Sequence, residues 1–246
     1  MWLLFLPILL HNFVIQAFPV FTFNGTSDSS ATPSFAFLVS EVDLPDIFIL
    51  CSSVKQARFD DVGFFSITGK DTREWLRVNL RTKFHEIKLA LVWDGKFHWL
   101  GKLQNPRLDY WYHVCLRLDL TEGEVEVAVN GKSLQSVLDR NVTNIPSKLE
   151  MKIGVGYDNQ QFQGSVANVK VLKGGNVKNI SMTPCKFRQN TILSWNPKNW
   201  KVIGSDLTLM NDFEEMFCVP SDHYNLGKPS FNKYEDFMKN FHVLYL

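Results

Sequence analysis

Three glutamates alternate along one short segment, and alternate residues of a β-strand lie on the same face. Glu122, Glu124 and Glu126 are separated by single residues, with Gly123 after the first. Hydrolysis of a glycosidic bond requires a pair of carboxylates at a suitable separation. Glu122 falls in a turn with Gly123, so exposed strand residues are the preferred interpretation. No Ser-His-Asp arrangement, glycine-rich phosphate loop or His-Glu-x-x-His motif occurs elsewhere. We therefore predict a protein that is not an enzyme and has no catalytic residue.

Aromatic residues suggest a second kind of chemistry, the stacking of a ring on a sugar. Trp93 and Trp99 flank an Asp-Gly dipeptide that is typical of a two-residue hairpin turn. Such a hairpin would present an aromatic ring at the surface, where it can pack against a sugar. Trp93 and Trp99 are therefore the candidate ligand-binding residues, whereas Trp111, Trp195 and Trp200 are expected in the core.

The four cysteines are Cys51, Cys115, Cys185 and Cys218. An even number fits an oxidising compartment, and four cysteines allow three disulfide connectivities. A zinc site is not favoured, because no Cys-x-x-Cys pair or cluster of histidines is present. Cys51 ends one expected strand and Cys115 lies inside another, so a cross-strand bridge between them is natural. Cys185 and Cys218 would then form a second bridge.

The N-terminal 17 residues have the length and pattern of a secretory signal peptide. An apolar run covers residues 2–10, and Ala17 offers a small residue for cleavage. Three sequons begin at Asn24, Asn141 and Asn179 and are candidate glycosylation sites. No later segment approaches the length of a transmembrane helix. We predict a secreted, extracellular glycoprotein without a membrane span.

The net charge of +1 and the scattered lysines and arginines argue against a nucleic-acid partner. Alternating apolar segments separated by turn signals, without a convincing internal helix, indicate an all-β sandwich of two antiparallel sheets. The expected strands cover residues 18–23, 34–39, 46–52, 63–67, 74–79, 86–93, 96–101, 110–119, 123–130, 150–155 and 165–172.

One block decides among sandwich folds. Residues 111–115 read Trp-Tyr-His-Val-Cys, and residues 123–132 read Gly-Glu-Val-Glu-Val-Ala-Val-Asn-Gly-Lys. This block, with Phe-Gln-Gly-Ser-Val-Ala-Asn-Val at 162–169, resembles the centre of pentraxin and laminin-G-like domains. Ile-Leu-Ser-Trp at 192–195, followed by Gly204, is similar to pentraxins in particular. The resemblance covers roughly residues 18–210. It implies a concanavalin A-like jelly-roll domain and the same Cys51–Cys115 pairing.

The pentraxin resemblance also implies a calcium-dependent ligand site. Residue-by-residue matching leaves Asp71 and Asp158 as the metal candidates, while Thr72 stands where the family has an asparagine. The acidic loop after Asp158 is shortened to Asn-Gln-Gln at 159–161. Because Ca²⁺ takes six to eight oxygen ligands, two carboxylates make a weak site. Solvated loop aspartates are the preferred interpretation, and no cofactor is assigned.

Residues 211–246 form an extension in which apolar residues at three- and four-residue spacing, from Phe231 to Tyr245, predict a short C-terminal helix. This helix either begins a truncated further module or folds against the sandwich.

The predicted function is non-catalytic recognition of a carbohydrate, a phospholipid headgroup or an extracellular protein, and an oligomer is possible. A structural or assembly ectodomain of a larger receptor-like protein is the alternative, and a jelly-roll glycoside hydrolase is a remote one. Five lysines, at positions 148, 152, 170, 173 and 178, are close in sequence and could form a surface for a sulfated glycan. Solvating and edge-protecting strand residues are the preferred interpretation of these lysines.

Overall fold

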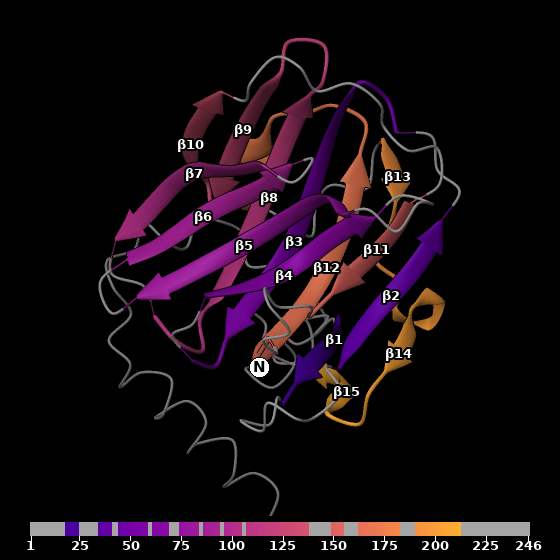
Figure 1. Cartoon of the computed structure of the whole chain (residues 1–246). Coiled ribbons are helices and arrows are strands. Elements are labelled where there is room, and N and C mark those ends of the chain that lie inside the picture. Colours follow the sequence, from indigo (N-terminus) through magenta and orange to yellow (C-terminus); the bar gives the residue numbers. More distant parts are fainter. Residues whose placement is uncertain are drawn as a thin grey trace, which may run out of the picture.

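The computed structural model describes residues 18–24, 34–40, 44–58, 61–68, 74–83, 86–93, 96–104, 107–137, 149–154, 162–182 and 190–212. Within these ranges two antiparallel β-sheets pack face to face (Figure 1), which confirms the predicted jelly-roll sandwich. The predicted signal peptide at 1–17 and the predicted helix after residue 230 lie outside the described residues. The proposed domain limits therefore stay a prediction.

The first sheet has eight strands in the described part of the chain. Their spatial order is β10 (Lys132–Val137), β9 (Glu124–Val129), β8 (Trp111–Asp119), β3 (Ile47–Gln56), β12 (Gly164–Leu172), β1 (Phe18–Phe23) and β15 (Leu207–Asp212), with β13 (Thr191–Leu193) also paired to β12. The second sheet has seven. Their order is β14 (Lys201–Ile203), β2 (Phe35–Ser40), β11 (Leu149–Ile153), β4 (Asp61–Thr68), β5 (Glu74–Lys83), β6 (Glu86–Trp93) and β7 (Lys96–Gln104).

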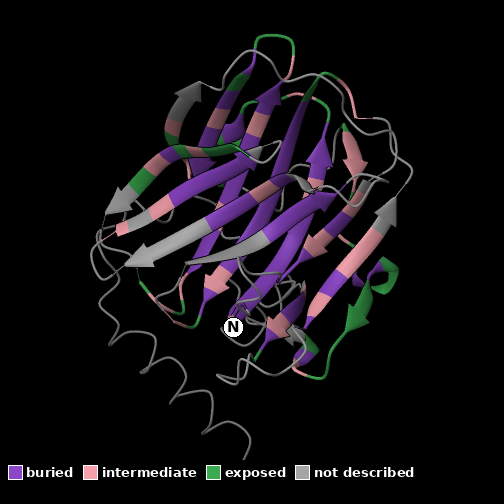
Figure 2. Ribbon diagram, in the orientation of Figure 1, coloured by how far each residue is buried: buried purple, intermediate pink, exposed green. Residues whose placement is uncertain are grey.

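The core lies between the sheets and consists of the inward residues of each alternating strand. Phe48, Phe65 and Phe162 are fully buried there. Figure 2 shows burial concentrated along the central strands and exposed positions along β14 and part of β7. Trp200 is buried in this core as predicted, and Trp195 is partly buried against it, with its indole N–H donating to the Pro19 carbonyl at 2.9 Å. Trp111 is also buried, but in a separate cluster with Val20 and Ala167 on the outer face of the eight-stranded sheet.

β3, β8 and β12 are buried along most of both faces. A short helix packs on the outer face of their sheet, over β8 and β9. This helix, α2 (Val177–Met182), buries Val177 and Ile180 in a second apolar cluster with Ile49, Cys51, Cys115, Ala128 and Leu172. Asn176 caps it by accepting the backbone N–H of Asn179 at 3.0 Å.

The disulfide between Cys51 and Cys115 is confirmed and lies within this second cluster. The two residues are directly opposite each other in the β3–β8 ladder, with their Cα atoms 4.1 Å apart. Cys185 and Cys218 lie outside the described residues, so the second bridge stays a prediction.

The expectation of no internal helix was wrong. The six residues of α2 are too few to show a helical repeat, and two of them are β-branched, so the helix depends on burial against the sheet. Four strands lie outside the expected ranges. β13 and β14 fall within residues 191–204, the segment that resembles pentraxins, whereas β10 and β15 were missed. β10 follows the Asn-Gly turn at Asn130 and Gly131, both of which have positive φ as that hairpin turn requires. β15 pairs with β1 over the full length of β1.

Candidate functional site: the outer face of the seven-stranded sheet

The two sheets present very different outer faces to the surroundings. α2 lies on the outer face of the eight-stranded sheet. On the outer face of the seven-stranded sheet, aromatic and cationic side chains alternate with one another. The cross-strand register identifies the residues of this face, because paired residues of neighbouring strands point to the same side.

An exposed aromatic pair occupies the β7 edge of this face. Phe97 and Trp99 are 50% and 47% exposed, and their ring centroids lie 4.8 Å apart in an edge-to-face arrangement. They pair with Val92 and Ala90 of β6. Lys88 places its Nζ 5.6 Å from the Trp99 ring centroid, a cation–π distance. Trp99 is therefore exposed in this hairpin, as the sequence predicted. Phe97 was not among the candidates identified from the sequence.

Trp93, the other candidate from the sequence, ends β6, and its backbone pairs with Lys96. Its side chain is outside what the structure describes, so its ligand-binding role stays a prediction.

A second aromatic pair lies at the opposite end of the same face. Phe35 and Phe37 of β2 have ring centroids 6.1 Å apart and are partly exposed. Lys152 of β11 lies 5.8 Å from the Phe35 ring, and Lys201 of β14 lies 5.9 Å from the Phe37 ring. Both ends of the face therefore combine an aromatic pair with lysine.

Small polar residues occupy the middle of the face. Ser66 of β4 and Asn79 of β5 are each 3% exposed. Arg77 of β5 is partly exposed, pairs with Ser66 and lies two residues before Asn79 on the same strand. The Asn79 Oδ1 is a buried acceptor that no donor in the described part of the chain satisfies.

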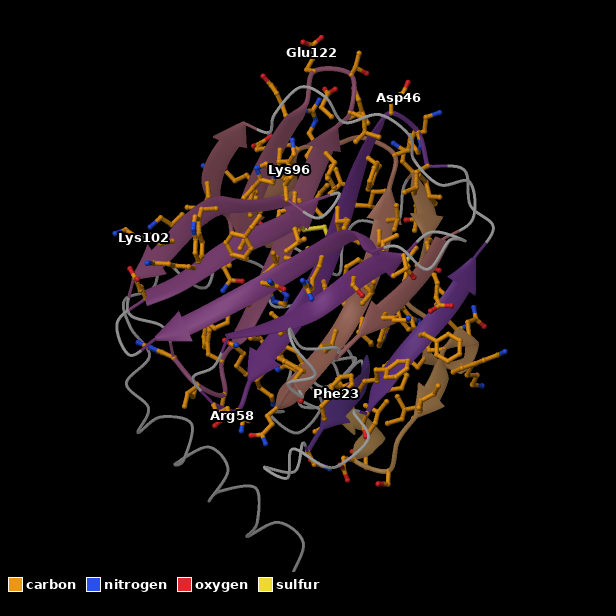
Figure 3. The ribbon with its side chains drawn as sticks, viewed as in Figure 1. Phe23, Asp46, Arg58, Lys96, Lys102 and Glu122 are labelled. Carbon is orange, nitrogen blue, oxygen red and sulfur yellow. A yellow bond between two sulfur atoms is a disulfide. The ribbon has the colours of Figure 1, made fainter. Side chains whose placement is uncertain are left out.

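The face is locally cationic although the whole chain carries a net charge of only +1. Its described side chains include two carboxylates, Glu86 and Glu150, against five cations, which are Arg77, Lys88, Lys102, Lys152 and Lys201. Figure 3 shows Lys102 at the end of β7, away from the middle of the sheet.

Glu86 pairs with Lys88 at 2.8 Å and with Lys102 at 3.9 Å, and Glu150 pairs with Lys152 at 2.8 Å. These partly exposed ion pairs hold the lysine heads near the sheet without removing the positive excess.

A partly buried histidine lies on the outer face of the eight-stranded sheet. Ser53 Oγ lies 2.7 Å from His113 Nδ1, across the β3–β8 ladder. Burial lowers the pKa of His113 to about 4, and the positive charge of Lys170 contributes to this shift. His113 is therefore neutral at physiological pH.

The alternating glutamates do not form one row. Glu124 and Glu126 lie in β9, where they pair with Asp119 and Arg117 of β8. Glu122 lies in the exposed turn between these strands, at one tip of the sandwich (Figure 3), and its N–H donates to Asp119 Oδ1.

The predicted lysine surface is not assembled as one patch. Lys152 belongs to the outer face of the seven-stranded sheet, whereas Lys170 pairs with Cys51 on the outer face of the eight-stranded sheet. Lys173 precedes α2 and Lys178 belongs to it, so both lie on the side of the eight-stranded sheet. Proximity in sequence was misleading here, because β11 and β12 follow each other in the chain but belong to different sheets. Lys148 lies outside the described residues.

Asp71 and Asp158, the metal candidates, also lie outside the described residues. Within the described ranges, no group of three or more His, Cys, Asp or Glu side chains is placed to hold a metal ion. Asn24 and Asn179 are exposed, as glycosylated residues must be, and Asn141 is not described. No helix in the described ranges is both long and apolar enough to span a membrane.

Comparison with solved structures shows what this fold resembles. The heptameric SAP-like pentraxin from Limulus polyphemus is 15% identical and aligns over 82% of this chain and 97% of its own, with a TM-score of 0.65. A candidate carbohydrate-binding protein from Bacteroides ovatus is 14% identical over 80% of this chain and 60% of its own, with a TM-score of 0.53.

The extracellular region of zebrafish Gpr126 (Adgrg6) is 15% identical and covers 85% of this chain, with a TM-score of 0.54. This chain spans 28% of that region. No protein-family model and no curated protein matches the sequence. At these identities the similarity establishes the fold, so the resemblance to pentraxin and laminin-G-like domains is confirmed at the level of the jelly roll. Function has to be argued from the residues.

Proposed function

We propose that this protein is a secreted, non-catalytic recognition protein that binds carbohydrate on the outer face of its seven-stranded sheet. The observation that carries the proposal is the Phe97–Trp99 pair, about half exposed on an edge strand with Lys88 beside it. Large aromatic rings are normally buried, and an exposed ring on a rigid strand can present one face to the apolar side of a sugar ring. Because Phe97 and Trp99 are nearly perpendicular, one ring would stack on the sugar while the other contacts its edge.

The compartment is consistent with this role. A disulfide buried beneath α2 indicates folding in an oxidising environment. Extracellular recognition by a soluble jelly roll would use such an environment, together with the predicted signal peptide and glycans.

The test is a glycan array followed by calorimetry with the full chain and three variants. Trp99→Ala and Phe97→Ala should each weaken binding of the best glycan at least about tenfold, because stacking of one ring contributes on the order of 1–2 kcal/mol. Leu209→Ala is the matched control, since Leu209 is equally exposed but belongs to β15 of the other sheet.

Unchanged affinity in Trp99→Ala and Phe97→Ala would contradict this site. Binding of no glycan at all would direct attention to a protein ligand, and gel-filtration with and without residues 221–246 would then test the assembly alternative.

A further inference from the structure

One cross-strand row on the outer face of the seven-stranded sheet passes through every strand of that sheet. The row is continuous in the pairing register, so its members point to the same side. From β14 to β7 it consists of Lys201, Phe37, Lys152, Ser66, Arg77, Val92 and Phe97.

The cations of this row occur on alternate strands. Lys201 is on the first strand of the sheet, Lys152 on the third and Arg77 on the fifth. Neighbouring strands lie about 4.8 Å apart, so successive cation positions are about 10 Å apart along the row. This interval is close to the length of one disaccharide unit in an extended polysaccharide.

The residues between the cations are suited to sugar rings rather than to charge. Phe37 lies between Lys201 and Lys152, with the Lys201 ammonium 5.9 Å from its ring. Ser66 separates Lys152 from Arg77 with a small side chain. Beyond Arg77 the row is apolar and ends at Phe97, which packs on Trp99.

We propose that this row binds a linear acidic polysaccharide that carries one carboxylate or similar anion per disaccharide and runs perpendicular to the strands. Lys201, Lys152 and Arg77 pair with successive acidic groups, and the guanidinium of Arg77 suits a two-pronged contact with an oxyanion. The proposal rests on the carbohydrate function proposed above. It adds the charge, the direction and the minimum length of the ligand.

The experiment measures binding of hyaluronan oligosaccharides of two, four, six and eight sugars to the full chain by calorimetry. These oligosaccharides carry one carboxylate per disaccharide, so the hexasaccharide supplies one for each cation of the row. Affinity should rise with length up to the hexasaccharide, gain little with the octasaccharide and fall as salt is raised. A neutral chitin hexasaccharide should bind at least about tenfold more weakly.

Variants test the individual positions. Lys201→Gln and Lys152→Gln should each weaken hexasaccharide binding about tenfold, since a hydrogen bond to a charged group is lost. Arg77→Gln should weaken binding by the same factor. Because Lys201 is exposed, Lys201→Gln should fold normally and keeps the test valid if the Arg77 variant does not fold. Lys178→Gln is the matched control, because Lys178 is an exposed lysine of α2 on the opposite side of the sandwich.

Three outcomes would overturn the row. In the first, chitin and hyaluronan bind equally, with binding lost in Trp99→Ala but kept in the lysine variants. That result would support the carbohydrate function and refute the role of the cationic row. If no oligosaccharide binds, both the carbohydrate function and the cationic row are refuted. Binding of phosphatidylserine vesicles, abolished by Lys201→Gln in the absence of oligosaccharide binding, would assign the face to a membrane surface instead.

Discussion

On the outer face of the eight-stranded sheet, Ile49, Cys51 and Cys115 lie under the helix α2, whereas on the outer face of the seven-stranded sheet Trp99 and Phe97 remain half exposed. Both faces belong to strands of similar length and pairing. They differ in what the outward positions carry. Where α2 packs, the first face has small and apolar residues that need a cover, whereas the second has cations, aromatic rings and short polar residues.

This difference separates stability from recognition. Side chains of the covered face exclude water and contribute by burial, so their removal should weaken the fold. The lysines and aromatic rings of the open face already contact solvent, so their removal should change the fold little and a ligand interaction much. The predictions below test that separation from the larger expected effects to the smaller.

Replacing both disulfide cysteines, as Cys51→Ala with Cys115→Ala, should lower the free energy of unfolding by about 4 kcal/mol, because the bridge closes a long loop in the unfolded chain. The two residues are separated by 64 positions. Urea denaturation of the double variant measures the loss, and the reduced wild-type chain should lose a similar amount. A loss below about 1 kcal/mol would show that the covered face does not depend on its bridge.

Ile180→Ala should lower the free energy of unfolding by about 3 kcal/mol, since Ile180 is 4% exposed and joins α2 to the second cluster. The same urea experiment measures it. Lys178→Ala on the same helix is the control and should change stability by no more than about 0.5 kcal/mol. If both variants behave alike, α2 is not held by the burial of its apolar side.

Acidification should destabilise the covered face through His113. Its folded pKa of about 4 is below the unfolded value of about 6.5, so the unfolded chain binds more protons between these pH values. The contribution is therefore fully present above pH 6.5 and is lost as the pH falls toward 4. The shift sets an upper limit of about 3 kcal/mol, and partial solvent contact of the ring reduces the expected loss to about 2 kcal/mol.

The variant His113→Gln should flatten the pH dependence of unfolding between pH 6.5 and 4 while retaining a hydrogen-bonding side chain beside Ser53. Thermal unfolding across this range measures it. An equally steep profile in the variant would assign the acid sensitivity to other groups.

The core of the fold was predictable because its signals are local. Alternation of apolar residues located β3 and β8, the Asn-Gly dipeptide located the turn after β9, and the positions of Cys51 and Cys115 in neighbouring strands gave the disulfide. Each of these depends on residues that are adjacent in sequence or on a pairing that the resemblance supplied.

The candidate site was predictable only in one residue, Trp99. The others come from strands far apart in sequence, so Lys152 and Lys201 were not seen as neighbours of Phe35 and Phe37. Strand order in the sheet decides this, and no local pattern reports strand order. The lysine surface drawn from sequence proximity failed for the same reason.

The smallest expected effect on stability belongs to the open face. Lys152→Gln removes the 2.8 Å ion pair with Glu150 and the contact with the Phe35 ring. Both partners of the ion pair are partly exposed, so water and salt screen the interaction and its loss should cost no more than about 0.5 kcal/mol. Urea denaturation measures this value, and the same preparation serves for hexasaccharide binding.

A loss above about 2 kcal/mol would place Lys152 among the residues that hold the sandwich together, and weaker binding in that variant could then follow from a damaged sheet. A small loss of stability accompanied by a tenfold loss of affinity would show that this lysine contributes mainly to the ligand, as the contrast between the two faces requires.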